Sequence, residues 1–436
     1  MVMQGFPPGS DAVVGSANWQ DPPFNRWSFW HVREVFPTQR IAAAAPGDAR
    51  PLAPRAARPD LRAVPVSVAV QGQVDEVVRT VGDVLDDTDT DAWVVLHEGE
   101  LVDEWYAPGG AADTPHAVMS VTKSVVGGVA GALADHGRLS PDDLLTDHVP
   151  ELAGTAWAGA TVRQVLDMRS GVSFFEDYTD PASDLQRLDE WLSDPPDGDP
   201  RGLYAFLLTL REGREHGGSF LYRSAETDVL GWVCERAAGR RMADLISELV
   251  WAPMGAEHPA EIICDGIGTA IHNGGLCATA RDLARFGQLL LDGGAVHRAD
   301  GPTQVLPAGW LRSAWAVDAD VRSAFLSSPA EQAFPGGWYR NKFWFRPGEH
   351  GDVLLCLGIH GQMIHVSRRT RTVCVKLSAW PTAQDPQRMQ ETLRACDAVG
   401  SVLAGLDRAG PRRGLAGVVS GLSRRPGVSS QHGSAV

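Results

Sequence analysis

The sequence predicts an α+β protein in which an antiparallel sheet, flanked by helices, is built from both ends of the chain around an inserted, mainly helical domain. Three observations support this fold class. A β-rich stretch at 93–106 comes first, and helical patterns dominate from about 140 to 295. Beyond residue 335 the apolar residues return to strand spacing, and a closing helix is expected from about Pro386 to Leu406.

Residues 1–65 are expected to form an N-terminal arm and connector. Aromatic residues crowd positions 17–36, and alanine, proline and arginine dominate positions 40–65, which favours an extended segment along the surface. The globular core is expected to begin near Val66. Trp93–Tyr106 is β-rich on both sides of a glycine, a pattern that predicts a hairpin.

The order of the elements divides the chain into lobes. An α/β lobe is assigned to 66–139 and 296–407, and a mainly helical lobe to 140–295. The last segment, 408–436, is rich in Gly, Pro, Arg and Ser, and we expect it to be a disordered tail.

Helix start signals mark the helical lobe. Ser140–Asp143 and Thr161–Gln164 each predict a helix N-terminus, the second through a capping box. Thr279–Asp282 opens a further helix with an apolar side, which ends before Gly293. The strands after it are expected at 338–345, 353–359, 363–366 and 373–378.

Composition excludes several kinds of partner. Lys and Arg number 39 against 54 Asp and Glu, a net charge of -15, so neither nucleic acid nor an anionic membrane is expected. The N-terminus lacks a secretory signal and no stretch approaches ~20 apolar residues, which predicts a cytoplasmic protein. The six cysteines and 13 histidines show no metal-binding spacing, so we expect buried free thiols, no metal and no cofactor.

The most informative motif is Met119-Ser120-Val121-Thr122-Lys123, which runs into a small, apolar stretch. In a helix, Ser120 and Lys123 stand one turn apart on one face, with Ser120 at the positive end of the helix dipole. A serine hydroxyl needs a neutral amine or imidazole within reach, and apolar packing favours the neutral form of Lys123. The alternative is that Ser120 is only an N-cap.

Two later segments supply partners for this serine. Tyr222 ends a short extended piece before an apolar helix, where a tyrosine can relay the serine proton to a leaving amine; the alternative is a core tyrosine, with Ser224 as an N-cap. Cys356–Gln362 is a strand whose glycines bracket an Ile-His pair. A strand N–H there can complete an oxyanion hole, and a tight bend between core strands is the alternative.

The order Ser-x-x-Lys, Tyr-x-Ser and a glycine-bracketed strand near a C-terminal helix resembles the penicillin-recognising serine hydrolase superfamily, with its class C β-lactamases, peptidases and esterases. Within it, the chain is similar to the 6-aminohexanoate-dimer hydrolases, the nylon-oligomer amidases. This resemblance covers roughly Ala17 to Leu406, and the segments that carry it are 17–37, 119–131, 176–178, 273–275, 280–285 and 358–362. It implies a β-lactamase/transpeptidase-like fold.

The resemblance also implies the catalytic roles. Ser120 would be the nucleophile, Lys123 the general base and Tyr222 the proton relay. The backbone N–H groups of Ser120 and Ile359 would form the oxyanion hole.

Four further residues are implied in substrate binding. Tyr178 resembles a loop tyrosine that closes over the substrate amide, and His360 stands beside the oxyanion residue. Asp189 and Asn273 fall where dimer-hydrolysing members carry substrate-binding residues, and Asp189 would pair with a substrate ammonium group. The alternative for Asp189 is a solvated acid on a helix face.

One departure separates the chain from the penicillin-recognising enzymes. They usually carry Lys-Thr-Gly on the third strand, where the cation helps to bind the substrate carboxylate, but the matching stretch here is Cys356-Leu357-Gly358. An amide or ester without that carboxylate is therefore favoured.

The sequence thus predicts a cytoplasmic serine hydrolase that cleaves small linear amides through an acyl-enzyme on Ser120. Its only predicted partner is a small-molecule amide or ester, and a homodimer is left open. A carboxylesterase of the same fold, or a catalytically silent binding or scaffold protein, are the alternatives.

Overall fold

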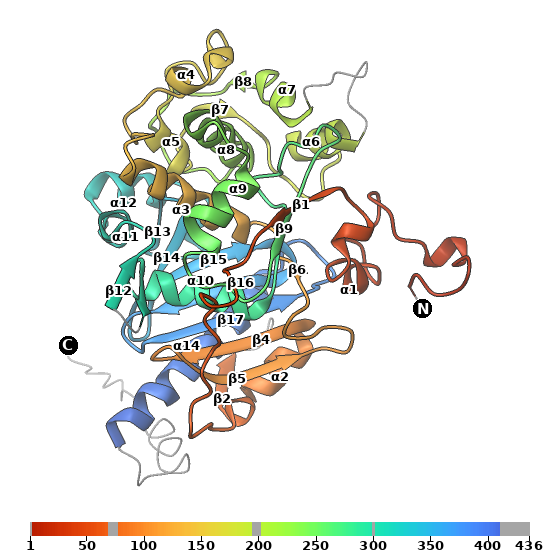
Figure 1. Cartoon of the computed structure of the whole chain (residues 1–436), viewed down its shortest axis with the longest axis vertical. Helices are drawn as coiled ribbons and strands as arrows, with labels where there is room; N and C mark the ends of the chain where they lie inside the picture. The colour runs from red at the N-terminus through yellow and green to blue at the C-terminus, as the bar shows by residue number, and fades with distance from the viewer. Residues whose placement is uncertain (1, 69–76, 194–201, 299–300, 410–436) are drawn as a thin grey trace, which may run out of the picture.

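The computed structural model describes residues 2–68, 77–193, 202–298 and 301–409, so the predicted tail lies outside the described residues from position 410 on. One seven-stranded antiparallel sheet joins both ends of the chain, as predicted (Figure 1). In spatial order its strands are β13 (Trp338–Arg340), β14 (Phe343–Gly348), β15 (Gly351–Gly358), β16 (Gln362–Ser367), β17 (Thr372–Ser378), β4 (Thr90–His97) and β5 (Glu100–Tyr106).

The hairpin predicted at 93–106 is formed by β4 and β5. Its turn residues Glu98 and Gly99 have φ angles of 51° and 82°, the left-handed pair that a tight two-residue turn requires. β17 pairs with β4, so the last strand of the chain is bonded to the first strand of the hairpin. This pairing is what closes the sheet from both chain ends.

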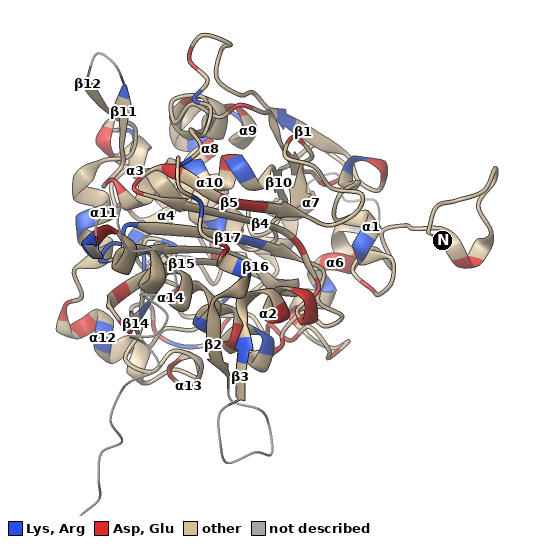
Figure 2. Ribbon diagram, turned by 90° about the horizontal axis from the view of Figure 1, so that it is seen from below, with Lys and Arg blue, Asp and Glu red and all other residues tan. Residues whose placement is uncertain are grey.

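Helices cover both faces of this sheet. α3 (Val121–Asp135) and α10 (Ala280–Leu291) contact one face, and α14 (Pro386–Ala409) and α2 (Val81–Asp87) contact the other. All of β4 is buried, with Val94 in the core cluster that includes α3 and Trp93 in the cluster that includes α14. Acidic and basic residues are spread over the surrounding helices and loops (Figure 2).

The predicted helical region lies on the α3 side of the sheet, towards the top of Figure 1. Thr161 forms the expected capping box, and the Thr279 side chain caps α10, which packs on β16 and β17 of the sheet. The helices of this region are α4 (Leu145–His148), α5 (Val162–Leu166), α6 (Asp184–Ser193), α7 (Gly202–Leu208), α8 (Ala225–Ala238) and α9 (Met242–Ile246).

A second, four-stranded sheet has the order β1-β9-β10-β6. Its members are β1 (Thr38–Ile41), β9 (Ala260–Ile263), β10 (Leu276–Ala278) and β6 (His116–Ala117). The remaining elements are α1 (Asn25–Ser28), β2 (Pro65–Val68), β3 (Val77–Thr80), β7 (Val172–Ser173), β8 (Arg211–Glu212), β11 (Ala295–Arg298), β12 (Gly301–Gln304), α11 (Ala308–Trp315), α12 (Ala319–Leu326) and α13 (Ala330–Ala333).

The prediction of a helix start at Ser140–Asp143 was wrong. These residues form a turn in which the Asp143 carboxylate accepts the Ser140 N–H at 2.7 Å, and α4 begins only at Leu145. The Leu145 N–H donates to the carbonyl of Ala160 at 2.9 Å. A capping-type residue pattern therefore serves a turn here, because the following backbone is paired with another segment.

The prediction of one strand over 338–345 was also wrong. Asn341 and Lys342, with φ angles of 53° and 68°, make a turn between β13 and β14. The Asn341 N–H donates to Asp167 Oδ1 at 3.1 Å and the Lys342 N–H to the Leu166 carbonyl at 3.1 Å. Contacts with a distant segment, absent from the local pattern, hold this turn.

The aromatic arm packs against the molecule close to the predicted nucleophile. Trp19 contacts Phe29 and Phe36 edge-on, with ring centroids 5.6 Å and 5.1 Å apart. Their cluster also includes Met119, and Ile359 packs against it. In the described part of the chain, every helix is too short or too polar to cross a membrane.

Glycines let α3 approach its neighbours at backbone distance. A Cβ on Gly127 would lie 2.5 Å from the Asn341 carbonyl oxygen, and one on Gly131 would lie 2.8 Å from the Trp310 ring. The small residues of this helix are thus a packing requirement.

We expect Gly127→Ala to lower the free energy of unfolding by about 1–3 kcal/mol, because the overlap with a backbone oxygen outweighs the ~1 kcal/mol gain in helix propensity. Gly128→Ala is the matched control, since its Cβ would make an ordinary 3.4 Å contact with Leu306. That variant should be neutral or more stable. Urea unfolding measures both, and equal effects at the two positions would contradict the packing argument.

Candidate active site

Ser120 stands at the start of α3, directly after a residue in a strained conformation. Met119 has a φ of 48°, in the left-handed region that non-glycine residues rarely adopt. The Ser120 hydroxyl makes no capping bond and lies 2.8 Å from the amine of Lys123. The N-cap alternative therefore does not describe this side chain.

The amine of Lys123 is surrounded by oxygen atoms. It lies 2.8 Å from Ser120 Oγ, 3.1 Å from Ser224 Oγ and 2.7 Å from the carbonyl oxygen of Asn273. The side chain is buried, and burial lowers the pKa of Lys123 to about 8, against the opposing charges of Glu176 and Asp228. At a pKa of about 8, roughly a tenth of the amine is neutral near neutral pH, far more than for an ordinary lysine.

The hydrogen-bond donors and acceptors around Lys123 determine where the lone pair of its neutral amine points. The Asn273 carbonyl can only accept, and the Ser224 hydroxyl donates its own proton to Glu176 Oε1 at 3.0 Å, so it must accept from Lys123. A neutral amine has two N–H donors, and both are used by these two acceptors. Its lone pair is left for the hydroxyl proton of Ser120, which is the arrangement a base needs.

Glu176 connects two residues of the site, and the sequence analysis did not identify it. Its carboxylate accepts the hydroxyl and the backbone N–H of Ser224, and also the Tyr178 hydroxyl at 2.7 Å. Glu176 lies in the loop between β7 and α6, far in sequence from Ser224 at the start of α8. The only signal was its place in the Glu-Asp-Tyr stretch at 176–178, which suggested the tyrosine alone.

Tyr222 is held over the lysine by aromatic packing. Its ring stacks on Trp344 with centroids 5.2 Å apart, and the Lys123 amine lies 5.1 Å from the Tyr222 ring centroid. Burial and the nearby charge of Glu176 raise the pKa of Tyr222 above its ordinary value, while a hydrogen bond with Ser120 opposes them. The phenol therefore stays protonated, and it is suited to donate a proton rather than to act as a base.

The end of β15 meets the nucleophile turn directly. A Cβ on Gly358 would lie 2.6 Å from the Val118 carbonyl oxygen and 3.0 Å from the Met119 Cβ. Only glycine permits this approach, which brings the end of β15, and Ile359 after it, to the turn that precedes Ser120. Gly358 thus brings together the two segments whose N–H groups were predicted to form the oxyanion hole.

The His360 ring is bonded within the protein. Its Nδ1 lies 2.8 Å from the Trp380 carbonyl and its Nε2 lies 3.3 Å from Gln20 Oε1, while its backbone N–H donates to the Ala383 carbonyl at 2.9 Å. Its φ of 58° forms the bend after Ile359. These contacts favour a positioning role for His360, because they anchor the bend that carries Ile359.

Asn273 and Asp189 are the other two residues that were predicted to bind substrate, and they have different partners. The Asn273 side-chain amide donates to Asp228 Oδ2 at 2.8 Å, and its backbone N–H donates to Oδ1 of the same residue. Asp189, on α6, has an exposed surface, yet the groups packed around it desolvate its carboxyl, and this effect first and the charge of Glu176 second raise its pKa to about 7. Its charge also acts on Tyr178, whose pKa is raised mainly by burial.

A helix-borne serine and lysine, a tyrosine before a second helix and a glycine-bracketed strand define a serine hydrolase with the β-lactamase type of fold. Residues 77–397 match the family model described as Beta-lactamase. The chain is 41% identical over 370 residues to the 6-aminohexanoate-dimer hydrolase of Paenarthrobacter ureafaciens, covering 84% of this chain and 88% of that protein. The chain therefore belongs to the β-lactamase family and, within it, to the 6-aminohexanoate-dimer hydrolases.

Solved structures agree with this assignment. A candidate 6-aminohexanoate-dimer hydrolase from Bacillus anthracis superposes with a TM-score of 0.74 at 28% identity, covering 87% of this chain and 94% of that one. A family VIII carboxylesterase superposes with a TM-score of 0.53 at 18% identity, covering 72% and 95%, which supports the fold alone.

For an ester without titratable groups, we expect kcat/KM to rise about tenfold per pH unit below the Lys123 pKa of about 8 and to level off above it. The sign follows because only the neutral amine can take the serine proton, and protonation removes its lone pair. Initial rates with p-nitrophenyl butyrate, corrected with Ser120→Ala protein, measure the profile. A flat profile between about pH 6 and about pH 8 would show that another group is the base.

Proposed function

We propose that this enzyme hydrolyses small linear amides that carry a free ammonium group, of the 6-aminohexanoate-dimer type, through an acyl-enzyme on Ser120. The observation that carries the proposal is a pair of carboxylates that act on each other electrostatically: Glu176, which is bonded to Ser224 next to the Lys123 amine, and Asp189 on α6. Cys356, where penicillin-recognising enzymes place a cation, is buried with its thiol against Ser124. The site therefore favours a cationic substrate over one recognised by its carboxylate.

The proposed acylation begins with proton transfer from Ser120 to the lone pair of Lys123, as Ser120 Oγ attacks the amide carbon. The tetrahedral oxyanion accepts hydrogen bonds from the N–H groups of Ser120 and Ile359. Collapse of this intermediate needs a proton on the leaving nitrogen, and Tyr222 donates it and recovers one from Lys123. Water then attacks the ester of Ser120 by the same route and releases the acid.

The substrate-binding residues divide by their contacts. Asp189 holds the substrate ammonium group, and Tyr178 closes over the amide from the loop that carries Glu176. Asn273 orients Lys123 through its carbonyl oxygen and borders the pocket through its amide, which Asp228 holds. His360 acts on the reaction through Ile359.

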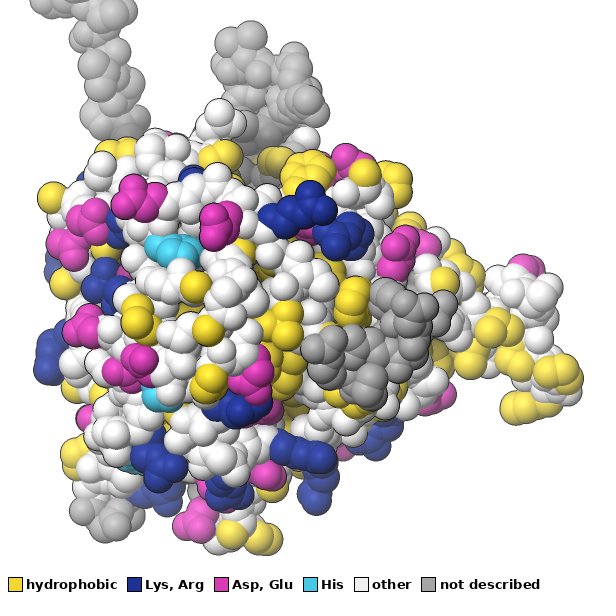
Figure 3. All heavy atoms as spheres, turned by 90° about the horizontal axis from the view of Figure 1, so that it is seen from above, with side chains coloured by type: hydrophobic (Ala, Val, Ile, Leu, Met, Phe, Trp, Pro, Cys, Tyr) yellow, Lys and Arg dark blue, Asp and Glu magenta, His cyan; other side chains and the backbone are white. Residues whose placement is uncertain are grey.

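Nylon oligomers are a reasonable substrate class, since the named relative at 41% identity is a 6-aminohexanoate-dimer hydrolase. A cytoplasmic location fits the six cysteines, all buried free thiols. On the face drawn in Figure 3, acidic and basic side chains are interspersed, which does not favour a polyanionic partner there. A homodimer stays a prediction.

A carboxylesterase is the second candidate, because an ester uses the same nucleophile, base and oxyanion donors without an ammonium subsite. Three substrates distinguish an amidase, an esterase and a β-lactamase: the 6-aminohexanoate linear dimer, p-nitrophenyl butyrate and nitrocefin. The proposed amidase should turn over the dimer well and nitrocefin poorly. Preference for the butyrate over the dimer would favour the esterase, and efficient nitrocefin hydrolysis would favour a β-lactamase.

Ser120→Ala should abolish hydrolysis of the dimer and of the butyrate in a folded protein, because the hydroxyl makes no capping bond whose loss would unfold α3. Lys123→Ala should come close to the same loss, since residues of one catalytic unit are not additive. Steady-state rates and labelling with a fluorophosphonate check both variants, with circular dichroism as the test of folding. Turnover that survives in folded Ser120→Ala protein would remove the nucleophile assignment.

Asp189→Asn should lower kcat/KM for the linear dimer by about fivefold to several hundredfold and spare the butyrate, which has no ammonium group. Glu190→Gln, an exposed acid next to it on α6, is the matched control and should change neither substrate. In wild-type protein, the ratio of dimer to butyrate kcat/KM should fall as the pH drops through about 7, where Asp189 takes up a proton.

The Asp189→Asn variant should lose that pH dependence of the ratio. An equal loss on both substrates would make Asp189 a structural residue. No loss on either substrate would leave the enzyme a general esterase.

A further inference from the structure

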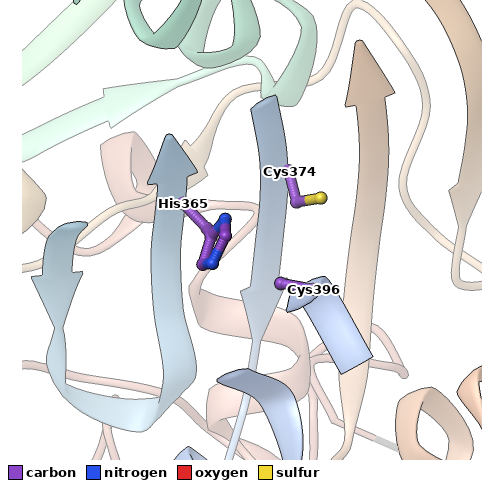
Figure 4. Close-up of side chains that lie close together, drawn as sticks. All are labelled: His365, Cys374 and Cys396. Carbon is purple, nitrogen blue, oxygen red and sulfur yellow. The ribbon is translucent and has the colours of Figure 1, made fainter. Parts of the chain in front are cut away.

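A histidine and two cysteines meet on the sheet face opposite α3. His365 comes from β16, Cys374 from β17 and Cys396 from α14 (Figure 4). Their ligand atoms all lie within 4.8 Å of one another, and each residue is 1% exposed. No short sequence spacing links them, so a metal site could not be predicted from sequence motifs.

The fold explains why these side chains converge. His365 and Cys374 are register partners on adjacent antiparallel strands, so their side chains stand side by side on one face of the sheet. α14 covers that face, and Cys396 belongs to its buried side together with Leu393 and Val399. The trio is therefore held by the central sheet itself rather than by loops.

The histidine is oriented as a metal ligand usually is. Its Nε2 lies 3.2 Å from Asp397 Oδ1, and Arg346 holds the other oxygen of that carboxylate at 2.7 Å. Its Nδ1 is buried and has no hydrogen-bond partner among the described residues. Histidine ligands typically donate one ring N–H to a carboxylate and offer the other nitrogen to the ion, so the orphaned Nδ1 points to a missing ligand.

The donor set selects the ion. Two thiolates and one imidazole suit Zn²⁺, whose bonds of about 2.3 Å to sulfur and about 2.0 Å to nitrogen separate tetrahedral ligands by about 3.5–3.8 Å. The ligand atoms lie within 4.8 Å of one another, so their separations have to shorten by only about 1 Å to reach this geometry. Two thiols that each lose a proton balance the charge of Zn²⁺, so the loaded site adds no net charge to the core.

We propose that His365, Cys374 and Cys396 form a buried structural Zn²⁺ site that ties α14 to the central sheet. A small cavity lined by His350, Ser367, His365, Cys396 and Asp397 adjoins the cluster. It offers an entry path and room for a water as the fourth ligand. The site is independent of the proposed function, because it lies on the face of the sheet away from the nucleophile helix.

The test uses the full-length protein without a histidine tag, stripped with a chelator and then titrated with Zn²⁺ or with Co²⁺ as a spectroscopic probe. We expect one Zn²⁺ per chain by native mass spectrometry, a Zn²⁺-dependent rise in melting temperature and a thiolate-to-Co²⁺ charge-transfer band. Cys374→Ser and Cys396→Ser should each weaken binding by about 10-fold or more. Cys264→Ser, a buried cysteine outside the cluster, should bind like the wild type.

Three results would overturn the proposal. Zn²⁺ binding that survives both cluster variants would place the ion elsewhere, and a Cys374–Cys396 disulfide in protein purified without oxidant would make the pair a covalent link. Should the cluster variants fail to fold, the wild-type Co²⁺ spectrum decides alone. A spectrum without the charge-transfer band would show that no thiolate binds the ion.

Discussion

The site depends on one buried amine, that of Lys123, which has to be uncharged for part of the time while both of its N–H groups are hydrogen-bonded. Burial disfavours the ammonium form of Lys123, and the two carboxylates nearby, Glu176 and Asp228, limit that effect. These opposing effects hold the Lys123 pKa at about 8. At that pKa the amine is basic enough to take a proton from serine, and part of it is neutral. Because Asn273 and Ser224 occupy its two N–H groups, the geometry of these acceptors decides where the lone pair points.

The scaffold serves this requirement through close backbone approaches. Gly127 lets α3 lie against the Asn341 turn, and Gly358 lets β15 reach the Val118 carbonyl. Met119, which stands between the β15 contact and α3, has a left-handed φ that a non-glycine residue rarely adopts. Left-handed φ angles at Met119 and at His360 thus accompany the meeting of a helix N-terminus and a strand end at the predicted oxyanion hole.

The features that were predicted correctly depend on interactions between residues close together in the sequence. The spacing of Ser120 and Lys123, the β4–β5 hairpin and the start of α10 depend on residues close in sequence, and all three are found in the structure. Other features depend on partners from separate segments of the chain: the turn at Ser140–Asp143, the turn at Asn341 and the contacts of Glu176. A single sequence carries no period or motif for such contacts, so they could not be predicted.

The N-terminal arm ties the start of the chain to the chemistry. Trp19 and Phe29 belong to the cluster that backs Met119 and Ile359, and Gln20 faces the His360 ring. The aromatic arm predicted at 17–36 therefore packs behind Ile359 and Met119, next to the N–H groups that are predicted to form the oxyanion hole. Trimming the gene to the lobes that carry Ser120, Lys123 and Tyr222 would keep these side chains but remove the packing behind Met119 and Ile359.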